Sequence, residues 1–354
     1  MVDKETICFY NGRNIKKEET EVKYRILDLA NWIPPVELYE KYGELFEFVR
    51  VPETREALLQ NIHSFDGYIS SLKIRLDEEV LDKATNLKAV FTPSTGLDHL
   101  DLKAIGDRGI PVFATKYDLD ILEQITSTAE MSLALLLGVV RRVPWAHGAA
   151  MQGVWAREAF RGHQLSGKTM GILGYGRLGK MMADYAKALR MKVIACDIKP
   201  IAAEGVEQVS FEELLQQSDV ISIHVHLNET TTGMINKAAF DKMKNGVFLV
   251  NTARGGIIDE NALLEALQSG KVAGAGLDVI DGEWMEDIGQ HPLIQYAREH
   301  DNLLISPHTG GTCYEAQYIT AENVIKKIDD YFRNDQKILP GTRLERSLVN
   351  EPKL

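Results

Sequence analysis

Short apolar segments alternate with amphipathic ones along most of the chain. In its first third, apolar runs predict buried strands at 24–29, 46–51, 67–70, 87–92 and 110–114. Between them, residues 37–45, 53–62 and 77–84 have the spacing of helices with one apolar face. Strands that alternate with helices in this way predict parallel βαβ units and a doubly wound sheet. A further short strand is expected at 7–10.

The alternation changes after residue 118 and then starts again. Residues 126–142 predict one long apolar helix, and 145–162, which hold Trp145 and Trp155, read as irregular. A second series of strands is predicted at 170–173, 192–196, 207–209, 219–224, 246–251, 273–278 and 302–306. The last helix, at 314–332, has no sheet left to extend, so we expect it to return to the first lobe. The prediction is an α/β protein of two doubly wound parallel sheets, with 1–118 and 312–354 in one domain and 119–311 in the other.

A glycine-rich turn opens the second series. Gly174, Gly176 and Gly179 have the G-x-G-x-x-G spacing of a dinucleotide-binding turn, between an apolar strand and an amphipathic helix. The spacing alone is weak evidence, but the strand and helix around it strengthen it. Asp197 ends the next strand, where an acid accepts hydrogen bonds from the adenosine ribose and disfavours a 2′-phosphate. We therefore predict an NAD site.

Composition narrows the class of protein. The net charge of −11 argues against a nucleic-acid or anionic-membrane partner. No apolar run reaches the length of a membrane span, and the first residues lack a signal peptide. The three cysteines form no close pair, so neither disulfides nor a metal site is expected. These features predict a soluble cytoplasmic protein.

Three stretches at predicted strand ends carry side chains suited to chemistry. Arg254 lies between an apolar strand and a Gly-Gly turn, where its planar fork of donors suits a carboxylate. Asp278 ends a strand beside small residues, and Glu283 follows on the loop. His308 lies between a strand and Gly310-Gly311, and its imidazole suits proton transfer near neutral pH. Each alone has a structural explanation, such as a salt bridge, a cap or a packed histidine.

Together these side chains indicate hydride transfer at a carbon that bears a hydroxyl and a carboxylate. His308 would exchange the hydroxyl proton, Glu283 would orient the imidazole, and Arg254 would bind the carboxylate. In the first lobe, Ser94, Thr95 and Gly96 follow a strand and could offer backbone N–H groups to a small anion; the alternative is an ordinary loop. Asn31-Trp32 is a second candidate contact.

The sequence resembles the D-isomer-specific 2-hydroxyacid dehydrogenase family from about residue 24 to 335. The resemblance is carried by residues 167–179, 224–236, 251–259, 273–283 and 306–311. It implies a Rossmann NAD-binding domain inserted into a flavodoxin-like substrate-binding domain, a homodimer, and NAD-dependent interconversion of a D-2-hydroxy acid and its 2-keto acid. It implies a catalytic set of Arg254, Glu283 and His308. The cofactor contacts that it implies, together with the glycine turn, are Arg177, Leu178, Asp197, Thr252, Ala253, Asp278, Gly310 and Gly311.

The sequence departs from the family pattern in two places. His224-Val-His226 replaces the usual His-x-Pro, and Glu283 lacks the usual following proline, which leaves Asp281 and Glu286 as alternative partners of the histidine. Two other functions stay open: a non-catalytic NAD-sensing scaffold or corepressor of the same fold, and a formate dehydrogenase. The acid at 283 disfavours the formate dehydrogenase, whose relatives have an amide there.

Overall fold

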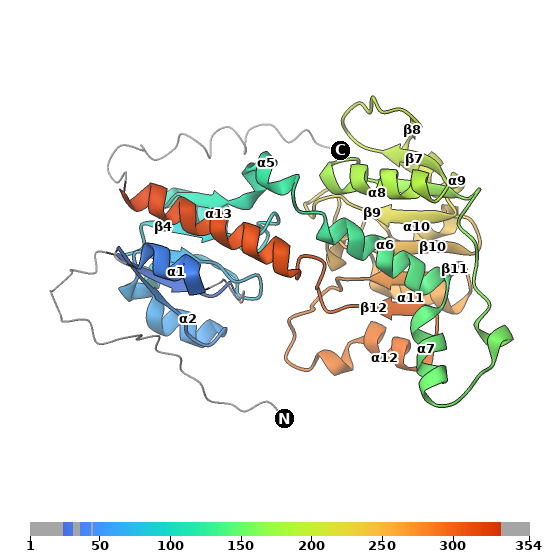
Figure 1. Cartoon of the computed structure of the whole chain (residues 1–354), viewed down its shortest axis with the longest axis horizontal. Coiled ribbons are helices and arrows are strands. Elements are labelled where there is room, and N and C mark those ends of the chain that lie inside the picture. The colour runs from blue at the N-terminus through green and yellow to red at the C-terminus, as the bar shows by residue number, and fades with distance from the viewer. Residues whose placement is uncertain (1–23, 31–35, 44, 334–354) are drawn as a thin grey trace.

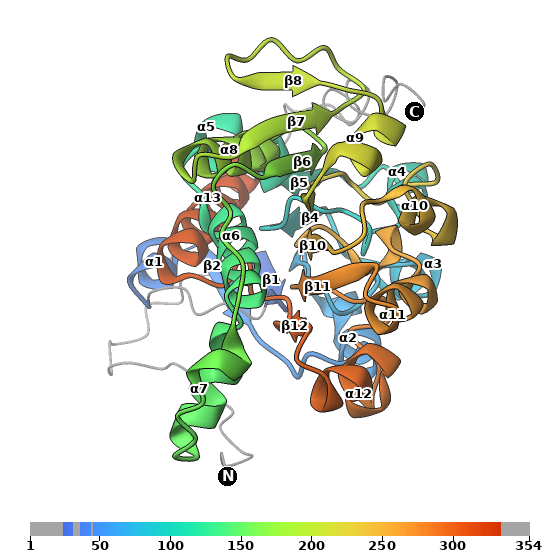
Figure 2. The same cartoon turned by 90° about the vertical axis from the view of Figure 1, so that its right-hand side faces the viewer.

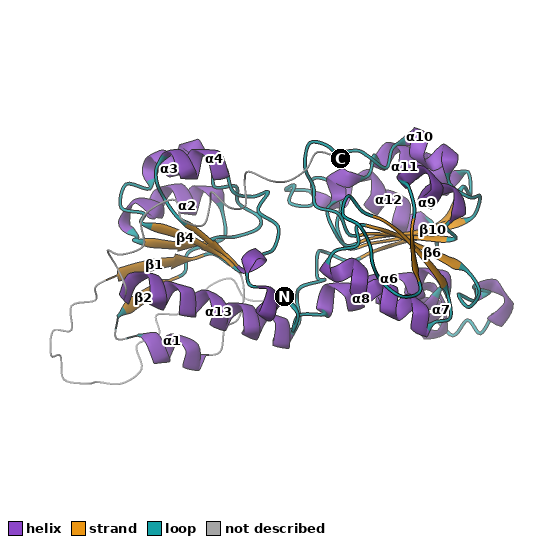
Figure 3. Cartoon of the chain, turned by 90° about the horizontal axis from the view of Figure 1, so that it is seen from above, coloured by secondary structure: helices purple, strands orange, loops and turns teal. Residues whose placement is uncertain are grey.

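The computed structural model describes residues 24–30, 36–43 and 45–333. These residues form two lobes, each a parallel sheet covered by helices on both faces (Figures 1 and 3). The α/β class and the two parallel sheets predicted from the sequence are confirmed. The strand expected at 7–10 and the candidate contacts at 31–32 lie outside the described residues.

The first lobe is built on a five-stranded sheet in the order β2-β1-β3-β4-β5. Its strands are β1 (Tyr24–Asp28), β2 (Phe46–Val49), β3 (Gly67–Ile69), β4 (Ala89–Thr92) and β5 (Val112–Ala114). The helices of this lobe are α1 (Val36–Tyr42), α2 (Arg55–Asn61), α3 (Glu78–Lys83), α4 (Leu102–Asp107) and α13 (Tyr314–Arg333). Neighbouring residues of β1 point to opposite faces, so Ile26 packs under α13 and Leu27 under α2 and α3.

The second lobe is built on a seven-stranded sheet in the order β12-β11-β10-β9-β6-β7-β8. Its strands are β6 (Thr169–Leu173), β7 (Lys192–Cys196), β8 (Val206–Gln208), β9 (Val220–Ile223), β10 (Val247–Asn251), β11 (Val272–Leu277) and β12 (Leu303–Ile305). One face is covered by α6 (Ser127–Val140) and α8 (Arg177–Ala188), as Figure 3 shows. The other face is covered by α9 (Phe211–Gln217), α10 (Lys237–Lys242), α11 (Glu260–Gln268) and α12 (Pro292–Glu299). The strand order reverses between β6 and β9, and ligands of such sheets bind at the carboxyl ends of the strands beside that reversal.

The last helix returns to the first lobe, as predicted. Helix α13 lies against β4, β5, α1 and the short α5 (Leu119–Leu122), and it crosses the first lobe in Figure 1. Its Lys327 ammonium donates to the carbonyl oxygen of Ala114 at 2.8 Å and pairs with Asp118. The chain therefore crosses to the second sheet between β5 and β6 and returns after β12. The division at 118/119 and 311/312 stays a prediction.

The prediction for the segment that holds Trp145 was wrong. Residues expected to be irregular include helix α7 (Val143–Met151), which projects from the second lobe in Figure 2. Pro144 lies in its first turn, where a proline needs no hydrogen-bonding N–H. Arg142 has a left-handed φ of 56° and separates α7 from α6. The helix buries no residue fully, so it lacks the one-sided apolar pattern by which helices are predicted.

Candidate active site at the carboxyl ends of the strands

The glycine turn fits a bound pyrophosphate. Gly174 has a φ of 93°, and a Cβ on it would lie 2.8 Å from the carbonyl group of His224. A Cβ on Gly179 would lie 2.1 Å from the Gly174 oxygen, so only glycine lets α8 approach the turn. A Cβ on Gly176 would meet no heavy atom of the described residues within 4 Å beyond its chain neighbours, and the helix has no side-chain cap. The free N–H groups of the first turn of α8 therefore face open space that a phosphate can occupy.

Asp197 is oriented by the backbone around the turn. One carboxylate oxygen accepts from the Tyr175 N–H at 2.7 Å, and the other accepts from the Lys199 N–H at 2.8 Å. Each oxygen keeps a lone pair for a further donor. The carboxylate thus lies at the end of β7, beside the glycine turn.

The Arg177 side chain is bound within the protein, and its predicted cofactor contact stays a prediction. Its guanidinium donates to the carbonyl oxygens of Leu122, at 2.9 Å, and of Ile125. Burial lowers the pKa of the Arg177 guanidinium below its usual value. The side chain therefore ties α8 to the segment between α5 and α6. The backbone N–H groups of Arg177 and Leu178, and not their side chains, are the groups that could bind a phosphate.

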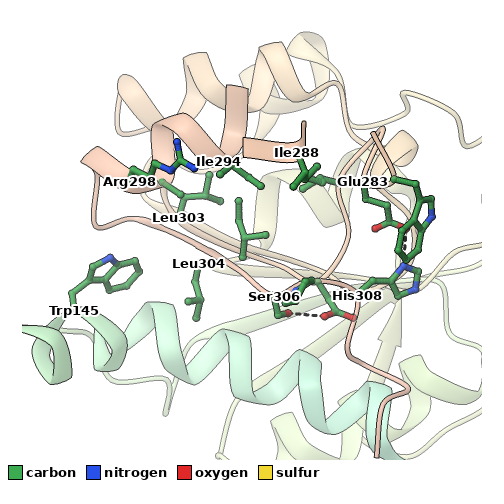
Figure 4. A pocket seen from close by; sticks show the side chains of 15 residues that line it. Trp145, Glu283, Ile288, Ile294, Arg298, Leu303, Leu304, Ser306 and His308 are labelled. Atoms are coloured by element: carbon green, nitrogen blue, oxygen red, sulfur yellow. Dashed lines mark hydrogen bonds and ion pairs between the residues drawn. The ribbon is translucent and has the colours of Figure 1, made fainter. Parts of the chain in front are cut away.

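His308 and Glu283 lie together, and the loop alternatives Asp281 and Glu286 do not take this place (Figure 4). The imidazole Nδ1 lies 2.7 Å from the Glu283 carboxylate oxygen, and both side chains are 18% exposed. Because a carboxylate only accepts, Nδ1 carries the proton of this bond and Nε2 faces outward. The Trp284 ring stacks beside the imidazole, with centroids 6.0 Å apart.

Hydrogen bonds to Asp278 hold the loop that carries His308. The buried Asp278 carboxylate accepts from the Ser306 hydroxyl at 2.6 Å and from the N–H groups of Thr309 and Gly310, each at 2.8 Å. His308 itself has a φ of 54° and donates its N–H to the Asp278 carbonyl oxygen at 2.8 Å. Asp278 and Gly310, predicted as cofactor contacts, are therefore bound to each other. Gly311 follows with no heavy atom within 4 Å of its Cβ position.

Arg254 bridges the two lobes. Its Nε donates to the Asp98 carboxylate at 3.0 Å, and its Nη1 donates to the Ala253 carbonyl oxygen at 2.8 Å. A Cβ on Gly96 would lie 1.8 Å from Nη2, so the guanidinium rests on the predicted substrate loop. Burial disfavours the ionised form of Asp98 and is the largest single effect. The charge of Arg254, its hydrogen bond to the carboxylate, a backbone hydrogen bond and the charge of His99 together outweigh burial, so the pKa of the Asp98 carboxyl lies below its usual range.

The backbone around Arg254 is fixed by buried polar side chains. The Asn251 amide accepts from the Ala253 N–H at 3.0 Å and donates to the Arg254 carbonyl oxygen at 2.9 Å. The Thr252 hydroxyl bonds to the Ser132 hydroxyl of α6 at 2.7 Å. Thr252 and Ala253 thus lie beside Arg254 at the end of β10.

The substrate loop differs from the prediction in one donor. The Ser94 N–H donates to the Thr92 hydroxyl at 3.3 Å, so it is not free for an anion, and the Ser94 hydroxyl donates to the Gly96 carbonyl oxygen at 2.7 Å. Thr95 and Gly96 lie beside Arg254 on the same loop. Below them, the buried His99 Nε2 bonds to the Ser70 hydroxyl at 3.0 Å, and desolvation lowers the pKa of His99 to about 4.

The sequence missed three residues of this region: Asp98, His99 and Trp284. An acid and a histidine directly after the predicted loop were a signal for the first two. The only sequence feature that pointed to Trp284 was its position, where the family usually has a proline.

A pocket of about 450 Å³ adjoins the His308–Glu283 pair. It runs between β12, α12 and Trp145 of α7, and Ser306, Glu283 and His308 close one end (Figure 4). Its remaining walls are mainly apolar and include Ile288, Ile294, Leu303 and Leu304.

Two absences hold for the described part of the chain. Residues 24–30, 36–43 and 45–333 contain no cluster of three or more His, Cys, Asp or Glu side chains that could hold a metal. Within the same ranges, no helix is both long and apolar enough to cross a membrane.

Comparison with known proteins agrees with this geometry. Residues 133–310 match the family model described as D-isomer specific 2-hydroxyacid dehydrogenase, NAD binding domain. The D-3-phosphoglycerate dehydrogenase of Archaeoglobus fulgidus is 39% identical over 78% of this chain and 52% of its own length. The hydroxypyruvate reductase of Thermotoga maritima is 36% identical over 77% of this chain and 87% of its own length.

A solved structure is also similar to this chain. D-lactate dehydrogenase of Aquifex aeolicus, complexed with NAD and lactic acid, superposes with a TM-score of 0.75 at 28% identity, over 88% of this chain and 96% of that one. The chain spans about half the length of several curated relatives that it matches, such as the archaeal enzyme. The seven-stranded lobe is an NAD-binding domain. The chain belongs to the D-isomer specific 2-hydroxyacid dehydrogenase family.

Proposed function

We propose that this protein is an NAD-dependent oxidoreductase that interconverts a D-2-hydroxy acid and its 2-keto acid. The observation that carries the proposal is the His308–Glu283 pair, joined at 2.7 Å at the carboxyl end of β12, on the same rim as the glycine turn and Arg254. When bound, NAD accepts or supplies the hydride. The catalytic set would be Arg254, Glu283 and His308.

The protein side chains handle the proton and the carboxylate. Because the Nδ1–H of His308 is donated to Glu283, Nε2 is the atom that takes the hydroxyl proton during oxidation and returns it to the carbonyl oxygen during reduction. Glu283 fixes the tautomer and stabilises the imidazolium while it holds the proton. The Arg254 Nη groups would bind the substrate carboxylate, with Nε held by Asp98 and with the loop of Thr95 and Gly96 as the opposite wall.

The cofactor set is drawn from the same rim. We propose that Gly174, Gly176, Gly179 and the backbone of Arg177 and Leu178 receive the pyrophosphate, and that Asp197 receives the ribose hydroxyls. Thr252, Ala253, Gly310 and Gly311 follow β10 and β12, and we propose that they contact the nicotinamide. Asp197 disfavours a 2′-phosphate, so NAD should be preferred over NADP.

The test is turnover of a panel of 2-keto acids with NADH: glyoxylate, pyruvate, hydroxypyruvate and 3-phosphohydroxypyruvate. At least one should be reduced, and His308→Ala should lower kcat about 10²-fold or more while the Kd of NADH is nearly kept. His300→Ala, which removes an exposed histidine of the same lobe, is the control. Tight NADH binding without turnover of any panel member would favour the non-catalytic scaffold instead.

We also propose that the protein is a homodimer. Large apolar side chains are exposed along α6, α7 and the segment after them: Leu137, Val143, Met151, Val154 and Trp155, the last 89% exposed. A second copy that covers this surface would remove it from water. Light scattering should give twice the chain mass, and Trp155→Ala should weaken the dimer; a monomer at micromolar concentration would contradict the proposal.

A further inference from the structure

A second histidine–glutamate pair contacts the loop that carries Glu283. His291 is the N-cap of α12 and is 5% exposed, and its Nε2 lies 3.2 Å from a carboxylate oxygen of Glu260, the first residue of α11. The His291 Nδ1 accepts the Leu293 N–H at 3.3 Å, as a helix cap does. Because Nδ1 is an acceptor, the ring proton of the neutral form lies on Nε2.

Both members of this pair hold the backbone of Asp281. The Asp281 N–H donates to the Glu260 carboxylate at 2.7 Å, and the His291 Nε2 donates to the Asp281 carbonyl oxygen at 2.9 Å. Burial raises the pKa of Glu260, against the opposing effects of the Asp281 N–H and of His291. The two backbone polar groups of one loop residue, two positions before Glu283, are thus held by the buried His291 and the partly buried Glu260.

The loop needs this anchor because it soon runs into solvent. Residues 284–287 are exposed, and Gly282 has a left-handed φ of 71°. On the opposite side, a Cβ on Gly255 would lie 2.1 Å from the Ile280 carbonyl carbon and 2.2 Å from the Asp281 nitrogen. The peptide between Ile280 and Asp281 therefore lies between Glu260 and Gly255, the residue directly after Arg254, and His291 holds the next peptide through the Asp281 carbonyl oxygen.

We propose that Glu260 and His291 are positioning residues, which fix the Asp281 peptide and thereby hold Glu283 against the Nδ1 of His308. This inference rests on the proposed function, in which Glu283 orients the proton-transferring imidazole. Neither residue touches the reacting atoms. Their effect is to keep one hydrogen bond of the acid–base pair in its geometry, and a small displacement of such a bond has a large effect on rate.

The first test measures the clamp without any turnover. In Glu260→Ala, hydrogen exchange of the Asp281 amide should become faster than in the wild type, because its acceptor is lost. Glu260→Gln keeps an oxygen acceptor and should restore most of the protection. Glu265→Ala, an exposed residue of the same helix, is the control and should exchange like the wild type. Unchanged exchange at Asp281 in Glu260→Ala would overturn the clamp even if the protein proved to have no dehydrogenase activity.

The second test measures catalysis. Glu260→Ala should lower kcat by about 10-fold or more, with the KM of NADH nearly unchanged, and Glu260→Gln should recover most of kcat. If Glu260 acts through Glu283, then adding Glu260→Ala to Glu283→Ala should cost nothing further. A full additional loss in the double variant, or wild-type kcat in the single one, would overturn the positioning role. Should Glu260→Ala fail to fold, His291→Asn keeps a capping acceptor for α12 but is too short to reach Asp281, and the same results are expected of it.

An inactive wild type on every 2-keto acid would instead refute the proposed function, and the exchange experiment would still decide the clamp. The two failures are therefore distinguishable.

Discussion

Lowering the pH should destabilise the folded protein through His99. Its ring ties the loops after β3 and β4 together, since Nε2 bonds to the Ser70 hydroxyl at 3.0 Å. The ring is 6% exposed, and among the described residues its Nδ1 has no hydrogen-bond partner. Desolvation, with a further contribution from Arg254 and against that of Asp98, lowers the pKa of His99 from 6.5 to about 4.

The sign and size of the effect are set by proton linkage. Between pH 6.5 and 4, the unfolded chain holds a proton on this imidazole and the folded chain does not. Folding stability contributed by the neutral ring is therefore present above pH 6.5 and lost as the pH falls toward 4. At ~1.4 kcal/mol per pKa unit, the loss between about pH 7.5 and pH 5 is ~2 kcal/mol for this one group.

The assay is urea unfolding of matched variants at the two pH values. His99→Gln keeps a polar group near Ser70 but does not titrate, so its stability should fall by ~2 kcal/mol less than that of the wild type over this range. His63→Gln, an exposed histidine of the same lobe, should follow the wild type. Equal losses in the wild type and in His99→Gln would refute the reasoning, because they would mean that His99 is protonated in the folded state.

Two substitutions of glycine test the cofactor turn and the substrate wall. Gly174→Ala combines a φ of 93° with a Cβ 2.8 Å from the His224 carbonyl, so NADH should bind about 10-fold more weakly or worse in a fluorescence titration. Gly233→Ala, with a φ of 61° and no atom within 4 Å of the added Cβ, is the control for backbone strain alone and should bind NADH normally. Gly96→Ala places a Cβ 1.8 Å from the Arg254 guanidinium and should raise the KM of the 2-keto acid about 10-fold while the KM of NADH is kept; an unchanged substrate KM would contradict the carboxylate role of Arg254.

The fold was largely predictable because it rests on local patterns. Buried parallel strands are short apolar runs, and the glycine turn has a fixed spacing, so both sheets and the return of α13 could be predicted. Helices without a clear apolar face were the failures. Helix α7 was expected to be irregular, and the short α4 was not predicted.

For the site, the sequence predicted only which residues follow the ends of neighbouring strands. Parallel strands bring their carboxyl ends to one rim, so the sequence pattern alone predicts that Arg254, Asp278 and His308 lie together. The hydrogen-bond partner of each side chain was not predictable, since the partners lie far away in sequence: Asp98 is 156 positions from Arg254, and Glu260 is 21 from the peptide that it holds. Pairing of that kind is decided by tertiary packing.

The position of His308 shows why those distant partners matter. A left-handed φ of 54° is unfavourable for a side chain such as histidine, by ~1 kcal/mol or more. The Asp278 carboxylate offsets this strain with charge-assisted hydrogen bonds to Ser306, Thr309 and Gly310, each worth ~2 kcal/mol. One buried acid therefore holds the backbone of the His308 loop, and Glu283 holds the Nδ1 of its imidazole, which leaves Nε2 as the ring nitrogen for proton exchange.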